Sequence, residues 1–396
     1  MYSQEMYKYG SQSSVIRQIF AYSQARAQVI GKENVFDFSL GNPSVPAPKA
    51  VRDAYETLLN EMSPLELHGY TAGPGDMSVR QAIADDLNER FGTDIEGGNL
   101  YMTCGAAAAL KIALCALYEK GDEAVTLTPF FPEYAVFTES AGYKFVPVTS
   151  EYGTFQPDLN KLEEAINERT KVIILNSPNN PSGVIYNRDK LVDLAQLLYR
   201  KQQEYDHPIF IIADEPYREL TYGKEVPFIP TLYRNTIVCY SYSKSFSLPG
   251  ERIGYVCVQP EVTSSQEVYF AVCGAGRALG YVCAPSLAQQ VIKKCVKVRP
   301  DVEPYRKNRD MLYGGLTHMG YECIAPDGAF YLCVKAPDGN TERFCERAKK
   351  YELLIVPGES FMAPGYVRLS YCVSEATVSN SLPRFEMLLE EYKQEK

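Results

Sequence analysis

In the first part of the chain, segments whose apolar residues follow a strand pattern alternate with segments whose apolar residues follow a helical pattern. Continuous runs rich in β-branched and other apolar residues predict strands at residues 123–128, 144–148, 171–175, 208–213 and 236–240. Apolar residues at helical spacing predict helices at residues 50–60, 79–91, 157–168 and 189–204. Because the strands carry no regular polar alternation, we expect helices to cover both faces of their sheet. The pattern therefore predicts an α/β fold with a mainly parallel sheet.

The pattern changes near residue 285. Helices are predicted at residues 286–298 and 304–319, and shorter strands at residues 328–334, 353–357 and 365–372. We interpret residues 49–284 as a large domain and residues 285–396 as a smaller α+β domain. Residues 1–48 are predicted to form an N-terminal arm and part of the small domain, with a helix at 13–30 and a short strand that ends near Gly41.

Composition narrows the function classes. The chain has 396 residues, of which 45% are apolar and 22% charged, and its net charge is -9. These values are ordinary for a globular protein, and no long basic run is present to bind nucleic acid or a membrane surface. The N-terminus lacks the apolar core of a signal peptide, and no apolar run approaches membrane-spanning length. We therefore expect a cytoplasmic protein.

Cysteine and histidine give no sign of a metal site. The eleven cysteines are scattered through apolar runs without a CxxC pair, which is typical of reduced thiols in a core. The three histidines are isolated from one another in the sequence. We expect neither a bound metal nor a Ser/His/Asp triad.

The stretch SYSKSFSLPGERIGY, residues 241–255, follows the predicted buried strand at 236–240. Open α/β sheets bind ligands at the ends of such strands. Lys244 can form an imine with a carbonyl, provided that burial or a positive neighbour frees its amine. Ser241 and Ser243 offer hydroxyl groups, and Arg252 offers a planar fork that suits a phosphate. An aldehyde that carries a phosphate matches this set, and pyridoxal phosphate is such a molecule.

Two further segments point to the same cofactor. Gly105 opens a helix of alanine and leucine, so the amides of Gly105, Ala106 and Ala107 form an uncapped helix start that favours a phosphate. Asp214 ends a buried strand and needs a cationic partner, which the pyridinium nitrogen of the cofactor would supply. A core helix that begins at a turn glycine would fit the first segment equally well.

With these motifs in place, the chain resembles the pyridoxal-phosphate-dependent aminotransferases of fold type I, in the class I/II family of aspartate, alanine and aromatic aminotransferases. The resemblance covers nearly the whole chain and implies a seven-stranded sheet in the large domain. The cofactor-binding residues that it implies are Gly105, Ala106, Ala107, Phe131, Asn180, Asp214, Tyr217, Ser241, Ser243, Lys244 and Arg252, with Tyr70 from a neighbouring subunit. The chain departs from some members in lacking hydroxyl side chains at the helix start and in having no tryptophan.

The resemblance also implies individual roles. Lys244 would carry the internal aldimine and act as the general base, Asp214 would pair with the pyridine nitrogen, and Tyr217 would bind the ring O3′. Asn180 would bind the same oxygen and lie next to the substrate. Arg368 would clamp the substrate α-carboxylate near Gly41, although the sequence Gly-Asn-Pro at Gly41 also fits a plain turn. Tyr70 implies a homodimer with shared active sites.

The sequence does not fix the substrate. Arg277 lies close to the place where dicarboxylate-specific members carry an arginine, which would favour aspartate or glutamate as the amino donor; an ordinary helix-end or interface arginine fits equally well. Amino acid and 2-oxo acid are the expected substrates of a transaminase. The same cofactor also supports a carbon-sulfur β-lyase or a decarboxylase. A non-catalytic pyridoxal-binding regulator fits less well, because little chain precedes Gly41 to form a DNA-binding domain.

Overall fold

The computed structural model describes residues 1–11 and 14–395. Its centre is a seven-stranded sheet in the order β2-β8-β7-β6-β5-β3-β4. The strands are β2 (Leu100–Thr103), β3 (Glu123–Thr128), β4 (Lys144–Thr149), β5 (Thr170–Asn176), β6 (Phe210–Asp214), β7 (Thr236–Ser241) and β8 (Gly254–Val258). Only β8 runs antiparallel to its neighbours in this sheet. The predicted mainly parallel, seven-stranded α/β fold is confirmed.

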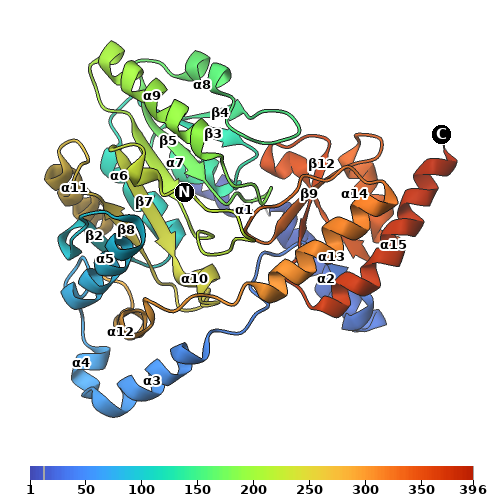
Figure 1. Ribbon diagram of the computed structural model, residues 1–396, viewed down its shortest axis with the longest axis horizontal. Coiled ribbons are helices and arrows are strands. Elements are labelled where there is room, and N and C mark those ends of the chain that lie inside the picture. Colours follow the sequence, from blue (N-terminus) through green and yellow to red (C-terminus); the bar gives the residue numbers. More distant parts are fainter. Residues whose placement is uncertain (12–13, 396) are drawn as a thin grey trace.

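Helices cover both faces of this sheet (Figure 1). Within β5, Val172 and Ile174 pack into a core with α6 (Ala106–Leu117) and α7 (Glu133–Glu139). Ile173 and Leu175 pack into a core with α5 (Met77–Phe91) and α9 (Arg188–Tyr205). Successive residues of a strand point to opposite faces, so a strand buried on both faces needs apolar residues at every position. This explains the continuous apolar runs of the sequence.

The helices associated with this part of the chain are α3 (Lys49–Glu61), α4 (Pro64–His68), α5 (Met77–Phe91), α6 (Ala106–Leu117), α7 (Glu133–Glu139), α8 (Leu159–Ala165), α9 (Arg188–Tyr205), α10 (Tyr242–Ser245), α11 (Ser265–Ala278) and α12 (Ser286–Cys295). The remaining helices are α1 (Gln4–Ser11), α2 (Val15–Ile30), α13 (Glu303–Met319), α14 (Thr341–Lys349) and α15 (Glu375–Gln394). The predicted helix at 13–30 corresponds to α2, except that residue 13 lies outside the described residues.

A second group of strands joins the two ends of the chain. The strands are β1 (Phe36–Asp37), β9 (Tyr331–Lys335), β10 (Leu353–Leu354), β11 (Val356–Pro357) and β12 (Tyr366–Ser370). β1 pairs in parallel with β10, and β11, β12 and β9 form an antiparallel sheet in that order. Figure 1 shows β9, β12, α13, α14 and α15 together on the right, with α2 on the same side. The N-terminal segment is therefore tied to the C-terminal part by backbone hydrogen bonds.

The division of the chain into domains at residues 48 and 285 stays a prediction. One helix that this division gives to the small domain, α12, packs against α3 and α5. Its residues Val291 and Ile292 belong to the same apolar core as the central sheet. After α12, buried residues of α13 and α15 such as Leu312, Leu316 and Phe385 belong to a separate apolar core.

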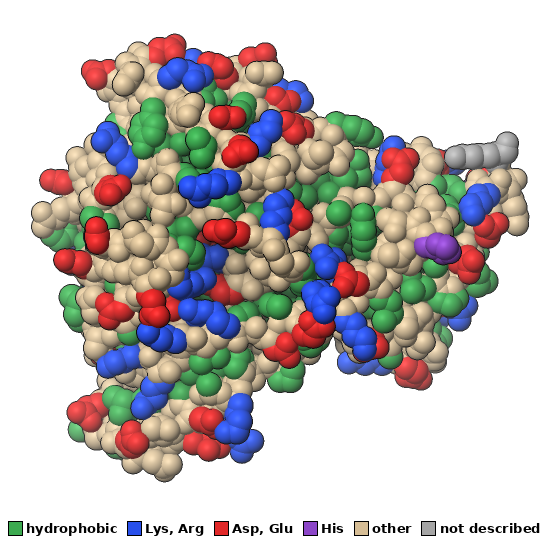
Figure 2. All heavy atoms as spheres, viewed as in Figure 1, with side chains coloured by type: hydrophobic (Ala, Val, Ile, Leu, Met, Phe, Trp, Pro, Cys, Tyr) green, Lys and Arg blue, Asp and Glu red, His purple; other side chains and the backbone are tan. Residues whose placement is uncertain are grey.

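Charge is mixed over the surface, and acidic and basic side chains are interspersed on the face shown in Figure 2. No helix of the described residues is both long and apolar enough to cross a membrane. The same residues contain no group of three or more His, Cys, Asp and Glu side chains that could hold a metal ion.

Candidate active site

Three neighbouring parallel strands end in polar residues at one cavity. β5 ends at Asn176, β6 at Asp214 and β7 at Ser241. The cavity holds about 320 Å³, which is the size of a small-molecule site. It is lined by Ile16, Gly41, Ala106, Ala107, Leu110, Phe131, Asn176, Asn180, Asp214, Pro216, Tyr217, Ser241, Ser243, Lys244, Pro249, Arg252, Tyr331 and Arg368. The ligand position predicted from the sheet pattern is thus the place where these side chains meet.

Lys244 lies on the short helix α10, immediately after β7. Its Nζ donates a hydrogen bond to the carbonyl oxygen of Gly41 at 2.6 Å. Burial, and to a lesser extent the positive charges of Arg252 and Arg368, lower the pKa of Lys244 to about 8. A lysine with this pKa is partly in its neutral, nucleophilic form near physiological pH.

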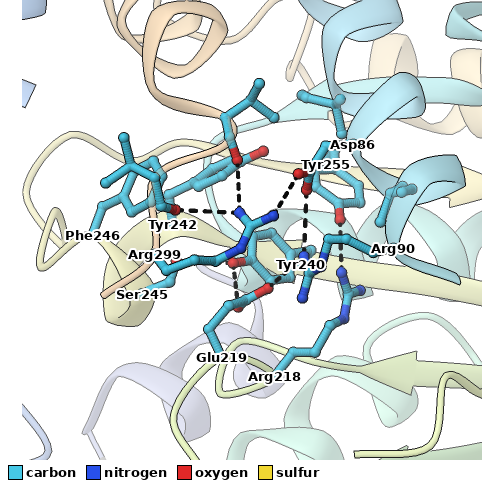
Figure 3. A pocket seen from close by; sticks show the side chains of 14 residues that line it. Asp86, Arg90, Arg218, Glu219, Tyr240, Tyr242, Ser245, Phe246, Tyr255 and Arg299 are labelled. Atoms are coloured by element: carbon cyan, nitrogen blue, oxygen red, sulfur yellow. Dashed lines mark hydrogen bonds and ion pairs between the residues drawn. The ribbon is translucent and has the colours of Figure 1, made fainter. Parts of the chain in front are cut away.

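The side of α10 that faces away from the cavity rests on a polar network (Figure 3). The hydroxyl of Tyr240 is bonded to Glu219 at 2.6 Å and to the hydroxyl of Ser245 at 2.8 Å. Arg90 forms an ion pair with the same Glu219 at 3.0 Å. Because Tyr240 and Ser245 come just before and just after Lys244, these bonds fix the local backbone that carries the lysine.

A cradle of hydrogen-bond donors lies at the start of α6. Gly105 caps the helix with a φ of 85°, and a Cβ on it would lie 2.8 Å from Nη2 of Arg252, so glycine is required here. Arg252 is held by the carbonyl oxygens of Pro249 at 3.0 Å and Cys104 at 3.2 Å. The free amides of a helix start, together with a guanidinium, favour an anion.

Two serines complete this cradle on the β7 side. Ser241 and Ser243 are buried, and their hydroxyl oxygens are 2.7 Å apart and hydrogen-bonded. The backbone amide of Ser243 donates to the hydroxyl of Ser241 at 3.1 Å. Gly254 on β8 allows the close approach of the two segments, since a Cβ there would lie 3.1 Å from Cα of Gly105. The donors of the cradle therefore come from β7, α10, α6 and the loop that carries Arg252.

Asp214 is a buried carboxylate with one oxygen unpaired. Only 5% of the residue is exposed. The hydroxyl of Tyr134 donates to Oδ2, whereas Oδ1 has no hydrogen-bond partner among the described residues. Burial raises the pKa of Asp214 to about 7, and the bond from Tyr134 opposes that rise. A cationic group placed in the cavity next to Oδ1 would stabilise the ionised carboxylate.

Arg368 lies in the middle of β12 and is buried between aromatic rings. Its guanidinium carbon is 4.8 Å from the ring centre of Tyr331 and 4.7 Å from that of Phe361. Nη1 donates to Oδ1 of Asn180 at 3.2 Å, Nη2 donates to the carbonyl oxygen of Ser39, and Nε has no partner among the residues that the structure describes. Burial lowers the pKa of Arg368. A carboxylate would supply the counter-charge that this guanidinium lacks.

The remaining walls are aromatic and closely packed. The hydroxyls of Tyr217 and Tyr331 are hydrogen-bonded at 2.9 Å. A Cβ on Gly41 would lie 2.0 Å from the hydroxyl oxygen of Tyr331, so the N-terminal loop can reach Lys244 only with glycine at this position. Phe131 follows β3 and contacts Tyr134 edge-on, with ring centres 5.8 Å apart. These rings give the cavity flat apolar surfaces.

Most of the residues predicted from the sequence converge on this cavity. Gly41, Ala106, Ala107, Phe131, Asn180, Asp214, Tyr217, Ser241, Ser243, Lys244, Arg252 and Arg368 all line it, and Gly105 borders it through Arg252. Tyr70 and Arg277 do not line it. Tyr70 is 98% exposed, and Arg277 is exposed on α11.

The sequence analysis did not assign six lining residues to the site: Ile16, Leu110, Asn176, Pro216, Pro249 and Tyr331. Asn176 donates through Nδ2 to the carbonyl oxygen of Asp214 at 2.9 Å and accepts from the amide of Asn180 at 2.7 Å. Asn176 ends a buried strand, as Asp214 does, and this position could have identified it as a site residue. Ile16, Leu110 and Tyr331 come from helices and a strand whose apolar pattern indicates only burial.

Three comparisons relate the chain to known proteins. The family profile "Aminotransferase class I and II" matches residues 33–385. An aspartate aminotransferase of Thermotoga maritima is 31% identical over 374 residues, which cover 93% of this chain and 94% of the relative.

Solved structures agree with this relationship. An amino transferase of Eubacterium rectale superposes with a TM-score of 0.97 at 52% identity and covers 99% of both chains. An aspartate aminotransferase of Thermus thermophilus with maleate superposes with a TM-score of 0.84 at 27% identity, over 98% of this chain and 99% of the other. The fold, the polar strand ends and these matches over nearly the whole length lead to one conclusion: the chain belongs to the class I and II aminotransferases and is a transaminase.

Proposed function

We propose that this transaminase uses pyridoxal phosphate to move an amino group between an L-amino acid and a 2-oxo acid, with Lys244 as its reactive amine. One observation carries the proposal: a single cavity combines an amine of lowered pKa, an anion cradle, an unpaired buried carboxylate and a buried arginine. Each of these features suits a different part of a phosphorylated pyridine aldehyde and its amino acid partner.

The residues of the cavity fit the cofactor. The amides of Ala106 and Ala107, the hydroxyls of Ser241 and Ser243, and Arg252 would hold the phosphate. Asp214 would pair through Oδ1 with the pyridine nitrogen, and that pairing would restore the ionised carboxylate whose pKa burial raises. Asn180 and Tyr217 would bind the ring oxygen, and Phe131 would pack against the ring.

When bound, pyridoxal phosphate supplies an aldehyde that condenses with amines and a ring that withdraws electrons from the substrate Cα. Lys244 would take the proton from Cα and return a proton to the other end of the reacting system, which its lowered pKa allows. Arg368 would hold the substrate α-carboxylate and so orient the Cα–H bond toward Lys244. The Asn180 side chain, which already contacts Arg368, would keep this guanidinium in place.

A second copy of the chain completes the proposed site. Tyr70 projects fully into solvent from the loop after α4, and Leu65 and Met77 nearby are also exposed. Val282 lies on the same face, since its carbonyl oxygen is within 3.3 Å of a Cβ built on Gly73. Burying this apolar surface in a homodimer would bring Tyr70 toward the phosphate cradle of the partner subunit.

The proposal is tested with the purified protein loaded with pyridoxal phosphate. We expect Lys244→Ala to abolish both the covalent attachment of the cofactor, detected by mass spectrometry after borohydride reduction, and transamination. Arg234→Ala, which changes an exposed arginine outside the cavity lining, is the matched control. If the reduced wild-type protein carried the cofactor on another lysine, the assignment of Lys244 would be wrong. If ammonia or carbon dioxide were released in place of a 2-oxo acid, a lyase or decarboxylase function would replace transamination.

A further inference from the structure

The cationic groups of the cavity determine how many negative charges it can bind. Among the described lining residues, three are cationic: Lys244, Arg252 and Arg368. In the proposed function, on which this inference rests, Lys244 reacts with the aldehyde, Arg252 binds the phosphate and Arg368 binds the α-carboxylate. Among the described lining residues of one chain, no cation is left over for a second carboxylate on the substrate, so such a carboxylate would need a cation from the partner subunit.

Part of the cavity wall apart from Lys244, Arg252 and Arg368 is apolar. Ala106, Ala107 and Leu110 lie on one face of α6, because residues three and four positions apart share a face. Leu110 is buried, and Ala107 is exposed. Beyond the backbone amides at its start, α6 therefore presents methyl groups to a ligand.

Ile16 on α2 adds to this apolar wall from the Arg368 side. It packs against a cluster that contains Ile19 and Phe361, and the Phe361 ring stacks on the guanidinium of Arg368. A substrate whose α-carboxylate binds Arg368 would therefore have Ile16 close by. The side-chain subsite is bounded on this side by an isoleucine.

The polar lining residues nearby already have partners. The hydroxyls of Tyr217 and Tyr331 bond to each other, and Asn176 bonds to Asp214 and Asn180. Arg277, the arginine that the sequence offers for a distal carboxylate, is exposed on α11 and outside the lining. From these contacts we infer that the side-chain subsite takes a neutral, apolar or aromatic side chain, and disfavours the second carboxylate of aspartate or glutamate.

The size of the preference follows from the loss of solvation. A carboxylate moved from water to an apolar wall without a partner loses its hydration, and even a neutral polar group is disfavoured there by more than a factor of ten. We expect kcat/KM for leucine or phenylalanine to exceed that for aspartate by at least about 10-fold. The Thermus thermophilus aspartate aminotransferase, by contrast, was solved with the dicarboxylate maleate.

The first experiment measures binding and needs no variant. Succinate and 4-methylpentanoate, which lack an amino group and cannot react, are titrated into the holoenzyme and followed by isothermal calorimetry. We expect 4-methylpentanoate to bind at least about 10-fold more tightly than succinate. Tighter binding of succinate would overturn the inference.

The second experiment separates this inference from the proposed function. The absorbance of the bound cofactor is followed after mixing the holoenzyme with leucine, phenylalanine, aspartate or glutamate. If none of the four converted the cofactor to its amine form, the proposed function would fail. If aspartate or glutamate converted it fastest, transamination would stand and the inference would fall; loss of that preference in Arg277→Ala would then place Arg277 of a partner subunit in the site.

A variant of the apolar wall and a variant of Arg277 are compared by their preference between aspartate and leucine. Ile16→Lys adds a cation beside the subsite, and we expect it to raise the ratio of aspartate to leucine kcat/KM by about 10-fold or more. Arg277→Ala is expected to leave this ratio unchanged. An unchanged ratio in Ile16→Lys, with a lowered one in Arg277→Ala, would contradict the assignment of the wall.

Discussion

Asp214→Asn tests how the buried carboxylate affects the stability of the apoprotein. Burial raises the pKa of Asp214 from its ordinary value of 3.8 to about 7 in the folded chain. The folded state therefore binds more protons than the unfolded state between these two values. The sign follows from linkage: stability falls as pH rises from about 4 to about 7, because the folded chain must ionise a carboxylate that water no longer solvates.

The magnitude follows from the same two values. A shift of this size corresponds to about 4 kcal/mol once the group is fully ionised in both states. Part of this effect is already present at pH 5, so about 2 to 3 kcal/mol should develop between pH 5 and pH 8. Asparagine cannot ionise and removes this dependence. Its amide would lack a partner at the position of Oδ1, which costs about 1 to 3 kcal/mol at every pH.

The assay is guanidinium denaturation of the apoprotein and of Asp214→Asn at pH 5 and pH 8. The difference in unfolding free energy between the two proteins should move by about 2 to 3 kcal/mol in favour of the variant as pH rises. Other titrating groups are common to both proteins and cancel in this difference. Parallel pH curves would refute the raised pKa, and with it the physical reason for placing a cation next to Asp214.

Two other substitutions and one pH profile test separate parts of the protein. Gly41→Ala should lower kcat/KM by about 100-fold, because its Cβ would lie 2.0 Å from the Tyr331 hydroxyl oxygen and displace the loop that contacts Lys244; Tyr331→Phe in the same chain should recover part of the loss, and no recovery would argue against this clash. The rate at which the apoprotein captures pyridoxal phosphate should rise with pH around a midpoint near 8, where Lys244 loses its proton, and a flat profile in stopped-flow absorbance would contradict the lowered pKa of Lys244. Arg218→Met should destabilise the fold by about 3 to 5 kcal/mol in denaturation experiments, because it leaves the buried Glu215 without its cation; a change below 1 kcal/mol would show that the pair is not needed.

The polar residues at the strand ends of the cavity could be predicted from the sequence, because the pattern that marks them is local. An apolar strand followed at once by polar residues marks both Asp214 and Ser241, and the strand ends observed at β6 and β7 lie at those residues. Lys244 follows within one helical turn. A parallel sheet brings the ends of such strands to one edge, so local pattern and topology together were sufficient.

The apolar residues that line the cavity could not be predicted in the same way. Leu110 and Ile16 occupy helix positions whose spacing indicates only that they are buried. Whether a buried side chain faces another side chain or a cavity depends on how distant segments pack, and no local pattern records that choice. β2 and β8 were not assigned as strands for a related reason: β2 has only four residues, and β8 begins at the glycine that makes room for Gly105.

Three charged side chains that line the cavity lower the stability of the apoprotein for the same reason, which is the burial of their charge. Asp214 has an unpaired oxygen and a raised pKa, Arg368 has an unpaired nitrogen, and Lys244 has a lowered pKa. In each case burial disfavours the charged form, and in each case the group lines the same cavity. A ligand with a cationic ring nitrogen and an anionic carboxylate would supply the missing partners of Asp214 and Arg368. Asp214→Asn should therefore stabilise the apoprotein above about pH 7 and weaken the binding of the ligand, because the same desolvation that destabilises the carboxylate strengthens its attraction to the ligand.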